Sequence, residues 1–321
     1  MTPRQTLILD SSQLSQYFSC AENWNLGSQQ NLVAIDKRDP SSTQVPSEAI
    51  TMGSLGHKYL EIYYLELFRT KSPQQAAAAA LAFNPDLADF ADNNNYPLDP
   101  LNRKKVLERF KDYLMTYPAD RDFQVAYKKL PAIFATNDCC NGQWKESLID
   151  SFRYEPLIEK GFSYKLFESY EYLFVLEGRI DFMGYAKDGT LIFMDHKFQL
   201  REHLLYERNV QFLNYALATG LNLGVINYIR LHDKVQVKTF VRQPLSFSSL
   251  RLYHWKQELI EKYVEIAKAI RTDSFPQNWG SCSGQWGRPC MFTPLCNEYN
   301  TSSREAIRQR DFTTKAIWRP W

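Results

Sequence analysis

The sequence predicts an α/β fold, in which a mixed β-sheet core is flanked by helices. Two observations predict it. Apolar side chains recur at helical spacing through the first third of the chain, whereas later aromatic and β-branched segments alternate as strands do. The expected strands cover 162–168, 171–185, 190–198, 224–231 and 234–242, with a helix at 204–219 between the third and fourth strands and a long helix at 247–271 after the fifth.

The chain has 321 residues, with 44% hydrophobic and 23% charged, an ordinary globular balance that can fill a large core. We expect one domain with three portions. These are a helical portion at 1–150, the sheet core at 151–271 and a cysteine-rich portion at 272–321.

The N-terminal portion is expected to hold four helices. Ser11 and Ser12 indicate the start of the first one, and the alanine run after Pro73 indicates another. The remaining two are expected at 52–69 and 102–117. Polar, Pro- and Asn-rich composition predicts loops at 27–48 and 84–100, and residues from Thr272 onward are expected to be irregular.

Charge and hydropathy limit the possible partners. The net charge is only +2, so nothing global indicates a nucleic-acid partner, and the local basic runs are typical of solvated faces. No stretch approaches the ~20 apolar residues that span a bilayer, and the apolar run at the N-terminus is too short for a signal peptide. We therefore expect a cytoplasmic protein with no membrane partner, in which clustered cysteines bind metal rather than form disulfides.

The candidate chemistry lies in one hairpin. Asp188-Gly189 predicts a tight turn that pairs two strands, one carrying Gly178-x-x-Asp181 and the other Asp195-His196-Lys197. Because side chains alternate along a strand, Asp195 and Lys197 share a face, and the turn can bring Asp181 onto the same surface.

Two convergent carboxylates suit Mg²⁺ or Mn²⁺, which lowers the pKa of bound water, and an adjacent lysine can balance charge developing on phosphorus. The peptide carbonyl of His196 could supply a further oxygen ligand. For Asp-x-Lys alone, an ordinary surface pair on a half-exposed strand is the simpler explanation. With Gly-x-x-Asp in the paired strand, a metal site becomes about as good an explanation as a surface pair.

Two further pieces lie on helices. His57 begins a helical turn that ends at Glu61, and Gln211 and Tyr215 are four residues apart on one face of the helix after the sheet strands. Each alone is more typical of a structural or surface residue.

Taken in order, these elements resemble the RecB-like branch of the PD-(D/E)XK nucleases. That branch includes the CRISPR-associated exonuclease family and the nuclease domains of bacterial helicase–nucleases. The resemblance implies a restriction-endonuclease-like sheet, with His57, Asp181 and Asp195 as metal ligands and Lys197 as the catalytic lysine. Gln211 and Tyr215 would support the site, and Glu159 would be a further acidic helper.

The resemblance extends to the cysteines, because members of this branch often hold a 4Fe–4S cluster through one N-terminal and three C-terminal cysteines. The corresponding residues here are Cys20, Cys282, Cys290 and Cys296, a set that also suits zinc. The spacing from Cys290 to Cys296 fits the family, but seven residues rather than two separate Cys282 from Cys290. Cys139 and Cys140 match nothing in the pattern, and we expect them to be non-ligands.

The function implied is a metal-dependent DNA exonuclease in recombination, repair or CRISPR-type or phage DNA processing. Its partners would be DNA, single-stranded or with free ends, and a helicase or recombination protein, because the chain lacks a Walker A motif of its own. Two alternatives stay open. One is a catalytically silent DNA-binding or assembly module of the same fold, and the other is an RNA nuclease.

Overall fold

The computed structural model describes residues 4–36, 39–43, 48–83, 100–117, 123–126, 156–199, 209–231, 239–282 and 290–314. Contacts divide the chain into two compact units. We call Pro46–Lys165, Glu177–Lys256 and Pro320–Trp321 the sheet unit, and Met1–Val45, Leu166–Leu176 and Gln257–Arg319 the terminal unit. Cys139 and Cys140 lie outside the described residues.

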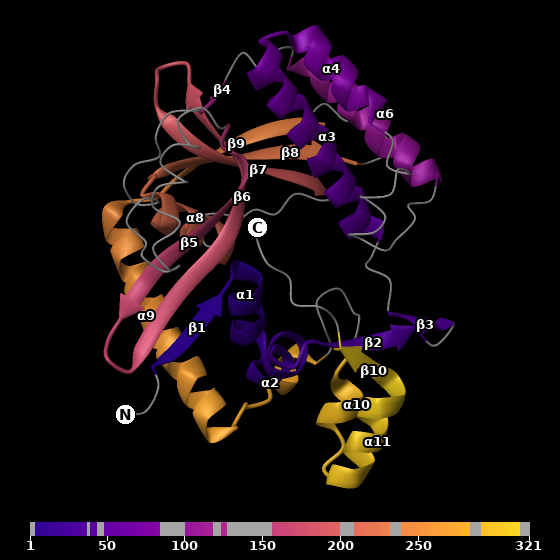
Figure 1. Cartoon of the computed structure of the whole chain (residues 1–321), viewed down its shortest axis with the longest axis vertical. Coiled ribbons are helices and arrows are strands. Elements are labelled where there is room, and N and C mark those ends of the chain that lie inside the picture. Colours follow the sequence, from indigo (N-terminus) through magenta and orange to yellow (C-terminus); the bar gives the residue numbers. More distant parts are fainter. Residues whose placement is uncertain are drawn as a thin grey trace. The chain divides into compact units, whose positions relative to one another are not determined.

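The sheet unit contains the mixed β-sheet that the sequence predicts (Figure 1). Its strands are β4 (Phe123–Val125), β5 (Ile158–Glu168), β6 (Tyr172–Ala186), β7 (Leu191–Gln199), β8 (Leu223–Arg230) and β9 (Phe240–Ser246). They follow the order β6-β7-β8-β9, with β4 and β5 paired to β6. β7 and β8 are parallel, whereas β6–β7 and β8–β9 are antiparallel. The parallel pair needs a crossover, and α8 (Val210–Thr219) lies within it.

The predicted hairpin between β6 and β7 is confirmed. The N–H of Ala186 donates to the carbonyl of Thr190 at 2.8 Å, which closes the loop. Gly189 has φ +83°, a left-handed conformation that glycine adopts without steric cost, and the Asp188 carboxylate accepts the N–H of Thr190 at 2.9 Å. The turn sets Phe182 opposite Met194, one residue away from both aspartates of interest.

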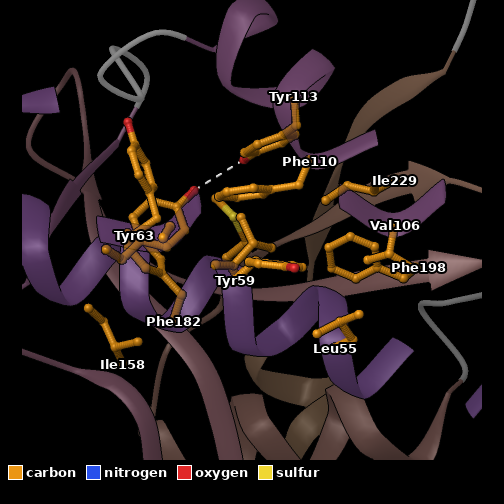
Figure 2. Close-up of a cluster of buried hydrophobic side chains, with 14 of the residues drawn as sticks. Leu55, Tyr59, Tyr63, Val106, Phe110, Tyr113, Ile158, Phe182, Phe198 and Ile229 are labelled. Atoms are coloured by element: carbon orange, nitrogen blue, oxygen red, sulfur yellow. Dashed lines mark hydrogen bonds between the residues drawn. The ribbon is translucent and has the colours of Figure 1, made fainter. Parts of the chain in front are cut away.

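Three helices pack together against one face of this sheet. They are α3 (Glu48–Thr70), α4 (Pro73–Ala82) and α6 (Pro100–Thr116). Their apolar side chains form a continuous core with Ile192, Met194 and Phe198 of β7, and Figure 2 shows Phe198 within it. The alternate residue Phe193 meets Tyr215 of α8 edge to face, so β7 is covered on both sides. Burial on both faces explains why Asp195 is inaccessible rather than half-exposed.

The terminal unit combines both ends of the chain. β1 (Gln5–Leu9) pairs in parallel with residues 172–176 of β6. The other elements are α1 (Ser11–Ser19), α2 (Ala21–Trp24), the π-helix η1 (Asn25–Gln29), β2 (Leu32–Asp36), β3 (Asp39–Thr43), the end of α9 (Ser249–Thr272), η4 (Trp279–Ser281), α10 (Thr293–Cys296), α11 (Thr301–Asp311) and β10 (Phe312–Thr314). β2 pairs with both β3 and β10, and α1 begins with a capping box between Asp10 and Gln13.

Three predictions of local structure are wrong. The loop expected at 27–48 contains β2, β3 and part of η1, and the irregular stretch expected after Thr272 contains α10, α11 and β10. The predicted sequence order also lacks β1. β1 pairs with β6 and β2 pairs with β10, far along the chain, so composition alone does not show these two strands. The predicted strand at 234–242 is β9, described from Phe240 to Ser246, and the predicted loop lies at 84–99 outside the described residues. Among the helices that the structure describes, none combines the length and apolarity needed to cross a membrane.

Candidate functional site

Asp181 lies on β6 next to Phe182, the residue at which the β6–β7 pairing ends. A Cβ on Gly178 would lie 2.6 Å from the ring of Phe162, so only glycine lets β5 pack closely here. Three residues further on, the buried carboxylate of Asp181 accepts the backbone N–H of His196 at 2.8 Å. The side chain thus links β6 to β7 just beyond Phe182 and Met194, the last pair of their ladder.

His57 and Glu159 converge on Asp181. Nδ1 of His57 lies 3.3 Å from Oδ2 of Asp181 and 3.6 Å from Oε1 of Glu159. One ligand atom from each of the three residues lies within 4.8 Å of the others, the geometry needed to hold one metal ion. The other oxygen of Glu159 pairs with Nε of Arg179 at 2.9 Å. Imidazole and two carboxylates are a donor set that Mn²⁺ or Mg²⁺ accepts.

The pKa shifts of His57 and Asp181 show that this position favours a positive charge. Burial alone would lower the pKa of His57, but the charges of Asp181 and Glu159 outweigh it and raise the pKa to about 9. Burial raises the pKa of Asp181, which the charge of His57 opposes. In the metal-free protein a proton on His57 therefore supplies the positive charge that a cation would supply between the carboxylates.

Asp195, Lys197 and Gln211 form a second cluster on the α8 side of β7. Nζ of Lys197 lies 2.8 Å from Oδ2 of Asp195 and donates to Oε1 of Gln211 at 3.1 Å. Nε2 of Gln211 donates to Oδ1 of Asp195 at 3.0 Å and to the hydroxyl of Tyr215 at 2.7 Å. The hydroxyl of Tyr215 in turn donates to the carbonyl of Arg179 at 2.6 Å, next to the Glu159 side of the site.

This network controls the charges of its members. Burial raises the pKa of Asp195 to about 6, although Lys197 opposes the shift. Burial would lower the pKa of Lys197, but the carboxylates of Asp195 and Asp181 raise it above its ordinary value. Burial also raises the pKa of Tyr215 well above its usual range. Lys197 is therefore a fixed ammonium and Tyr215 a neutral hydroxyl at neutral pH.

His196 lies between Asp195 and Lys197 with its side chain on the opposite face of β7. The ring is buried, and burial followed by the positive charge of His57 holds the pKa of His196 well below its usual range. The sequence predicts only the backbone carbonyl of His196 as a metal ligand. Its N–H contacts Asp181, which leaves the carbonyl role a prediction.

The four predicted cysteine ligands all belong to the terminal unit and all are free thiols. The backbone N–H of Asn278 donates to Sγ of Cys20 at 3.3 Å, and the carbonyl of the same residue accepts from Sγ of Cys282 at 3.8 Å. The N–H of Cys290 donates to the carbonyl of Cys282 at 2.9 Å. Cys296 lies in the adjoining apolar cluster, packed with Leu26, Leu32, Ala34, Phe292, Leu295 and Phe312.

The same thiols raise one another's pKa. Burial raises the pKa of Cys296 to about 12, with further contributions from Glu22 and from the neighbouring sulfurs of Cys290 and Cys20. Burial and the sulfurs of Cys282 and Cys20 likewise raise the pKa of Cys290. Several thiolates near one another are unfavourable without a cation, and a bound metal reverses that preference.

The comparisons with known proteins agree with the geometry of the sheet unit. The family model of the PD-(D/E)XK nuclease superfamily matches residues 11–297, most of the chain. The chain belongs to this superfamily, and its membership supports a metal-dependent nuclease. No curated protein is significantly similar to it in sequence. The restriction-endonuclease-like fold is thereby confirmed, whereas the RecB-like branch and the iron–sulfur cluster stay predictions.

The structure brings the predicted site residues together in two groups rather than one. His57 and Asp181 meet at the candidate metal position, and Asp195, Lys197, Gln211 and Tyr215 form the adjoining network. The third donor at the metal position is Glu159, to which the resemblance gave only a helper role. A glutamate in an alternating strand carries no local signal of its conformation. Glu159 has φ +50°, outside the extended region, and this conformation could not be predicted.

Proposed function

We propose that this chain is a Mg²⁺- or Mn²⁺-dependent exonuclease that hydrolyses phosphodiester bonds of DNA, single-stranded or with free ends. The observation that carries the proposal is the convergence of His57, Glu159 and Asp181 beside a buried Asp195–Lys197 pair. A structural ion pair alone does not account for three ligand atoms directed at one point next to it.

His57, Glu159 and Asp181 would hold the metal, with Asp195 and the carbonyl of His196 as further ligands expected from the motif. When bound, the metal lowers the pKa of a water molecule and polarises the phosphate. The fit is chemical as well as geometric, because Asp181 is fixed by a backbone donor and His57 sits where a positive charge is favoured.

Lys197 would act as a fixed cation rather than as a base. The neighbouring carboxylates keep it protonated, so it can donate hydrogen bonds to a phosphate oxygen and offset negative charge that develops during hydrolysis. Gln211 orients this ammonium and one oxygen of Asp195 at once, and Tyr215 holds the amide of Gln211 from the other side. These contacts pre-organise the charged groups before substrate binds.

The cysteines support a second part of the proposal, a 4Fe–4S cluster held by Cys20, Cys282, Cys290 and Cys296. The proximity of the thiols supports a shared site, because the sulfurs of Cys20, Cys282 and Cys290 raise the pKa of neighbouring thiols. The cluster would be structural, joining segments near both ends of the chain.

The biological setting follows from the resemblance and is part of the proposal. We propose a cytoplasmic protein that acts in recombination, repair or CRISPR-type or phage DNA processing, together with a helicase or recombination partner. The free thiols suit a reducing compartment.

Cleavage of labelled linear and circular DNA, single- and double-stranded, with Mg²⁺ and with Mn²⁺ tests the activity. Asp195→Ala and Lys197→Ala should each reduce the rate by roughly a hundredfold or more, because the first removes a metal ligand and the second removes the cation that offsets developing negative charge. Near wild-type cleavage by purified Asp195→Ala protein would contradict the assignment. Cleavage of RNA but not DNA would identify an RNA nuclease, and binding without cleavage would identify a silent module.

A further inference from the structure

A row of polar side chains lies buried behind the candidate site, on the face of the sheet opposite Asp195 and Lys197. His196 of β7 is paired in register with Asn227 of β8, which is paired in register with Arg242 of β9. His196 is 2% exposed and Asn227 is 0% exposed. Nδ2 of Asn227 lies 2.8 Å from Nδ1 of His196.

Helix α6 adds Tyr113 to this row. The hydroxyl of Tyr113 accepts from Nδ2 of Asn227 at 3.0 Å and from Nη2 of Arg242 at 2.9 Å. It also lies 3.1 Å from the hydroxyl of Tyr64 on α3, the contact drawn as a dashed line at Tyr113 in Figure 2. Three elements of the sheet unit (α3, β8 and β9) thus meet α6 at one buried phenol.

The contact between Asn227 and His196 has a direction. Arg242 can only donate, and the amide nitrogen of Asn227 has two hydrogens but no lone pair to offer. The Tyr113 oxygen accepts from Arg242 and from Asn227, and either hydroxyl of the Tyr113–Tyr64 pair can donate to the other. The second hydrogen of Asn227 then points to Nδ1 of His196, whereas Oδ1 of Asn227 and Nε2 of His196 are buried without a hydrogen-bond partner among the described residues.

This direction fixes the state of His196. An accepting Nδ1 means that the imidazole is neutral with its hydrogen on Nε2. The ring also stacks on Tyr64 at 5.8 Å with 13° between the planes, so both its orientation and its tautomer are held.

The backbone of His196 carries this constraint into the site. Its N–H donates to the carboxylate of Asp181 at 2.8 Å, and its two neighbours in the chain are Asp195 and Lys197. A rotation of the His196 peptide would shift the donor that holds Asp181 and would change the direction of both flanking side chains. The buried ring therefore anchors one peptide on which three functional groups depend.

We propose that Tyr113, Asn227 and His196 form a positioning chain that sets the geometry of the metal site from the opposite face of the sheet. The inference rests on the proposed function of that site and adds residues outside its motifs. If these side chains only filled the core, their removal would lower stability without a specific effect on metal binding.

Two measurements on metal-free and Mn²⁺-titrated protein test the proposal. ¹⁵N NMR of the histidine rings reports the tautomer of His196, and the chain has only 5 histidines to assign. Electron paramagnetic resonance of free Mn²⁺ gives the dissociation constant. Asn227→Leu should remove the Nε2–H tautomer signature and weaken Mn²⁺ binding by about tenfold or more, the usual effect of losing a partner that orients ligands.

Tyr113→Phe provides a milder variant in case Asn227→Leu does not fold. It deletes only the phenol oxygen and should weaken Mn²⁺ binding by roughly threefold to tenfold. The matched control is Tyr263→Phe, which also deletes one buried phenol oxygen, here a donor to the carbonyl of Val175 at 2.7 Å in the terminal unit. The control should be destabilised to a similar degree and bind Mn²⁺ as the wild type does.

A wild-type His196 with its hydrogen on Nδ1 would overturn the proposal, as would unchanged Mn²⁺ affinity in the folded variants. An equal loss of affinity in Tyr263→Phe would also overturn it, because the effect would then follow stability. Wild-type protein that binds Mn²⁺ but cleaves no nucleic acid would end the nuclease proposal instead. In that case the tautomer and the Mn²⁺ affinities still decide whether the positioning chain exists.

Discussion

Replacing Gln211 by glutamate changes one atom in the network around Asp195 and Lys197. In the wild type the amide nitrogen of Gln211 donates to Oδ1 of Asp195 at 3.0 Å, and the amide oxygen accepts from Lys197 at 3.1 Å. Gln211→Glu keeps the shape and the contact to Lys197 but places a carboxylate oxygen where the nitrogen was. Two carboxylates then face one another in a buried position.

The distances set the size of the effect. Two negative charges ~3 Å apart repel by about 5 kcal/mol at an effective dielectric constant of 20. Lys197 lies equally close and offsets part of this, so we expect a net loss of about 2–3 kcal/mol in the free energy of unfolding when both carboxyls are ionised. Protonation of the new carboxyl removes the repulsion and restores a donor toward Asp195.

The sign of the pH dependence follows. The folded protein raises the pKa of the new glutamate above its unfolded value of ~4.3, because burial and Asp195 both oppose ionisation. Such a group costs nothing below the unfolded pKa, and its penalty grows as pH rises toward the folded pKa. The stability gap between wild type and Gln211→Glu should therefore be small near about pH 5 and largest near about pH 8.

Urea unfolding in the presence of a chelator at several pH values measures this gap. Gln211→Met is the control, because it removes the same hydrogen bonds without adding a charge and should show a gap that does not change with pH. The reasoning would be refuted by a Gln211→Glu gap that stays constant from about pH 5 to about pH 8, or that narrows as pH rises.

Two further predictions concern the cysteines and a glycine. Cys20→Ser should abolish the iron content and broad absorption of anaerobically purified protein and cost about 4 kcal/mol of stability, since a cross-link closing a very long loop is lost. The control, Cys139→Ser, should have neither effect. Colourless wild-type protein with one zinc would support the four-thiolate site but refute the cluster. Gly178→Ala should lower the free energy of unfolding in urea by about 1–3 kcal/mol, because its methyl group would meet the Phe162 ring at 2.6 Å. Gly53→Ala on α3, whose methyl group would meet only a carbonyl oxygen at 4.0 Å, should raise it instead.

The central hairpin was predictable because its information is local. Alternation placed the two strands, Asp188-Gly189 placed the turn, and the resulting antiparallel pairing of β6 and β7 is confirmed. The i,i+4 spacing of Gln211 and Tyr215 likewise predicted a shared helix face, and their side chains are hydrogen-bonded at 2.7 Å. In each case the partners are close in sequence, so the geometry of one element determines the contact.

The remaining features depend on contacts between distant segments. β1 pairs with residues 172–176, and β2 pairs with β10 near the other end of the chain, so no local pattern identifies their partners. The row from His196 to Arg242 could not be predicted either, because its prediction requires the registers of three strands. The sequence predicts a role only for the carbonyl of His196, because a histidine between two motif residues gives no sign of which side chains its ring contacts.

Glu159 holds its place in the site in a backbone conformation that most side chains avoid. A non-glycine residue at φ +50° costs roughly 1–2 kcal/mol relative to glycine. Selection for stability alone would therefore replace this residue by glycine, and the carboxylate beside His57 would disappear with it. Stability and activity oppose one another at this position. A homologue that has lost its catalytic role is expected to replace this glutamate by glycine early. The residue at position 159 is therefore a marker that separates active from inactive homologues.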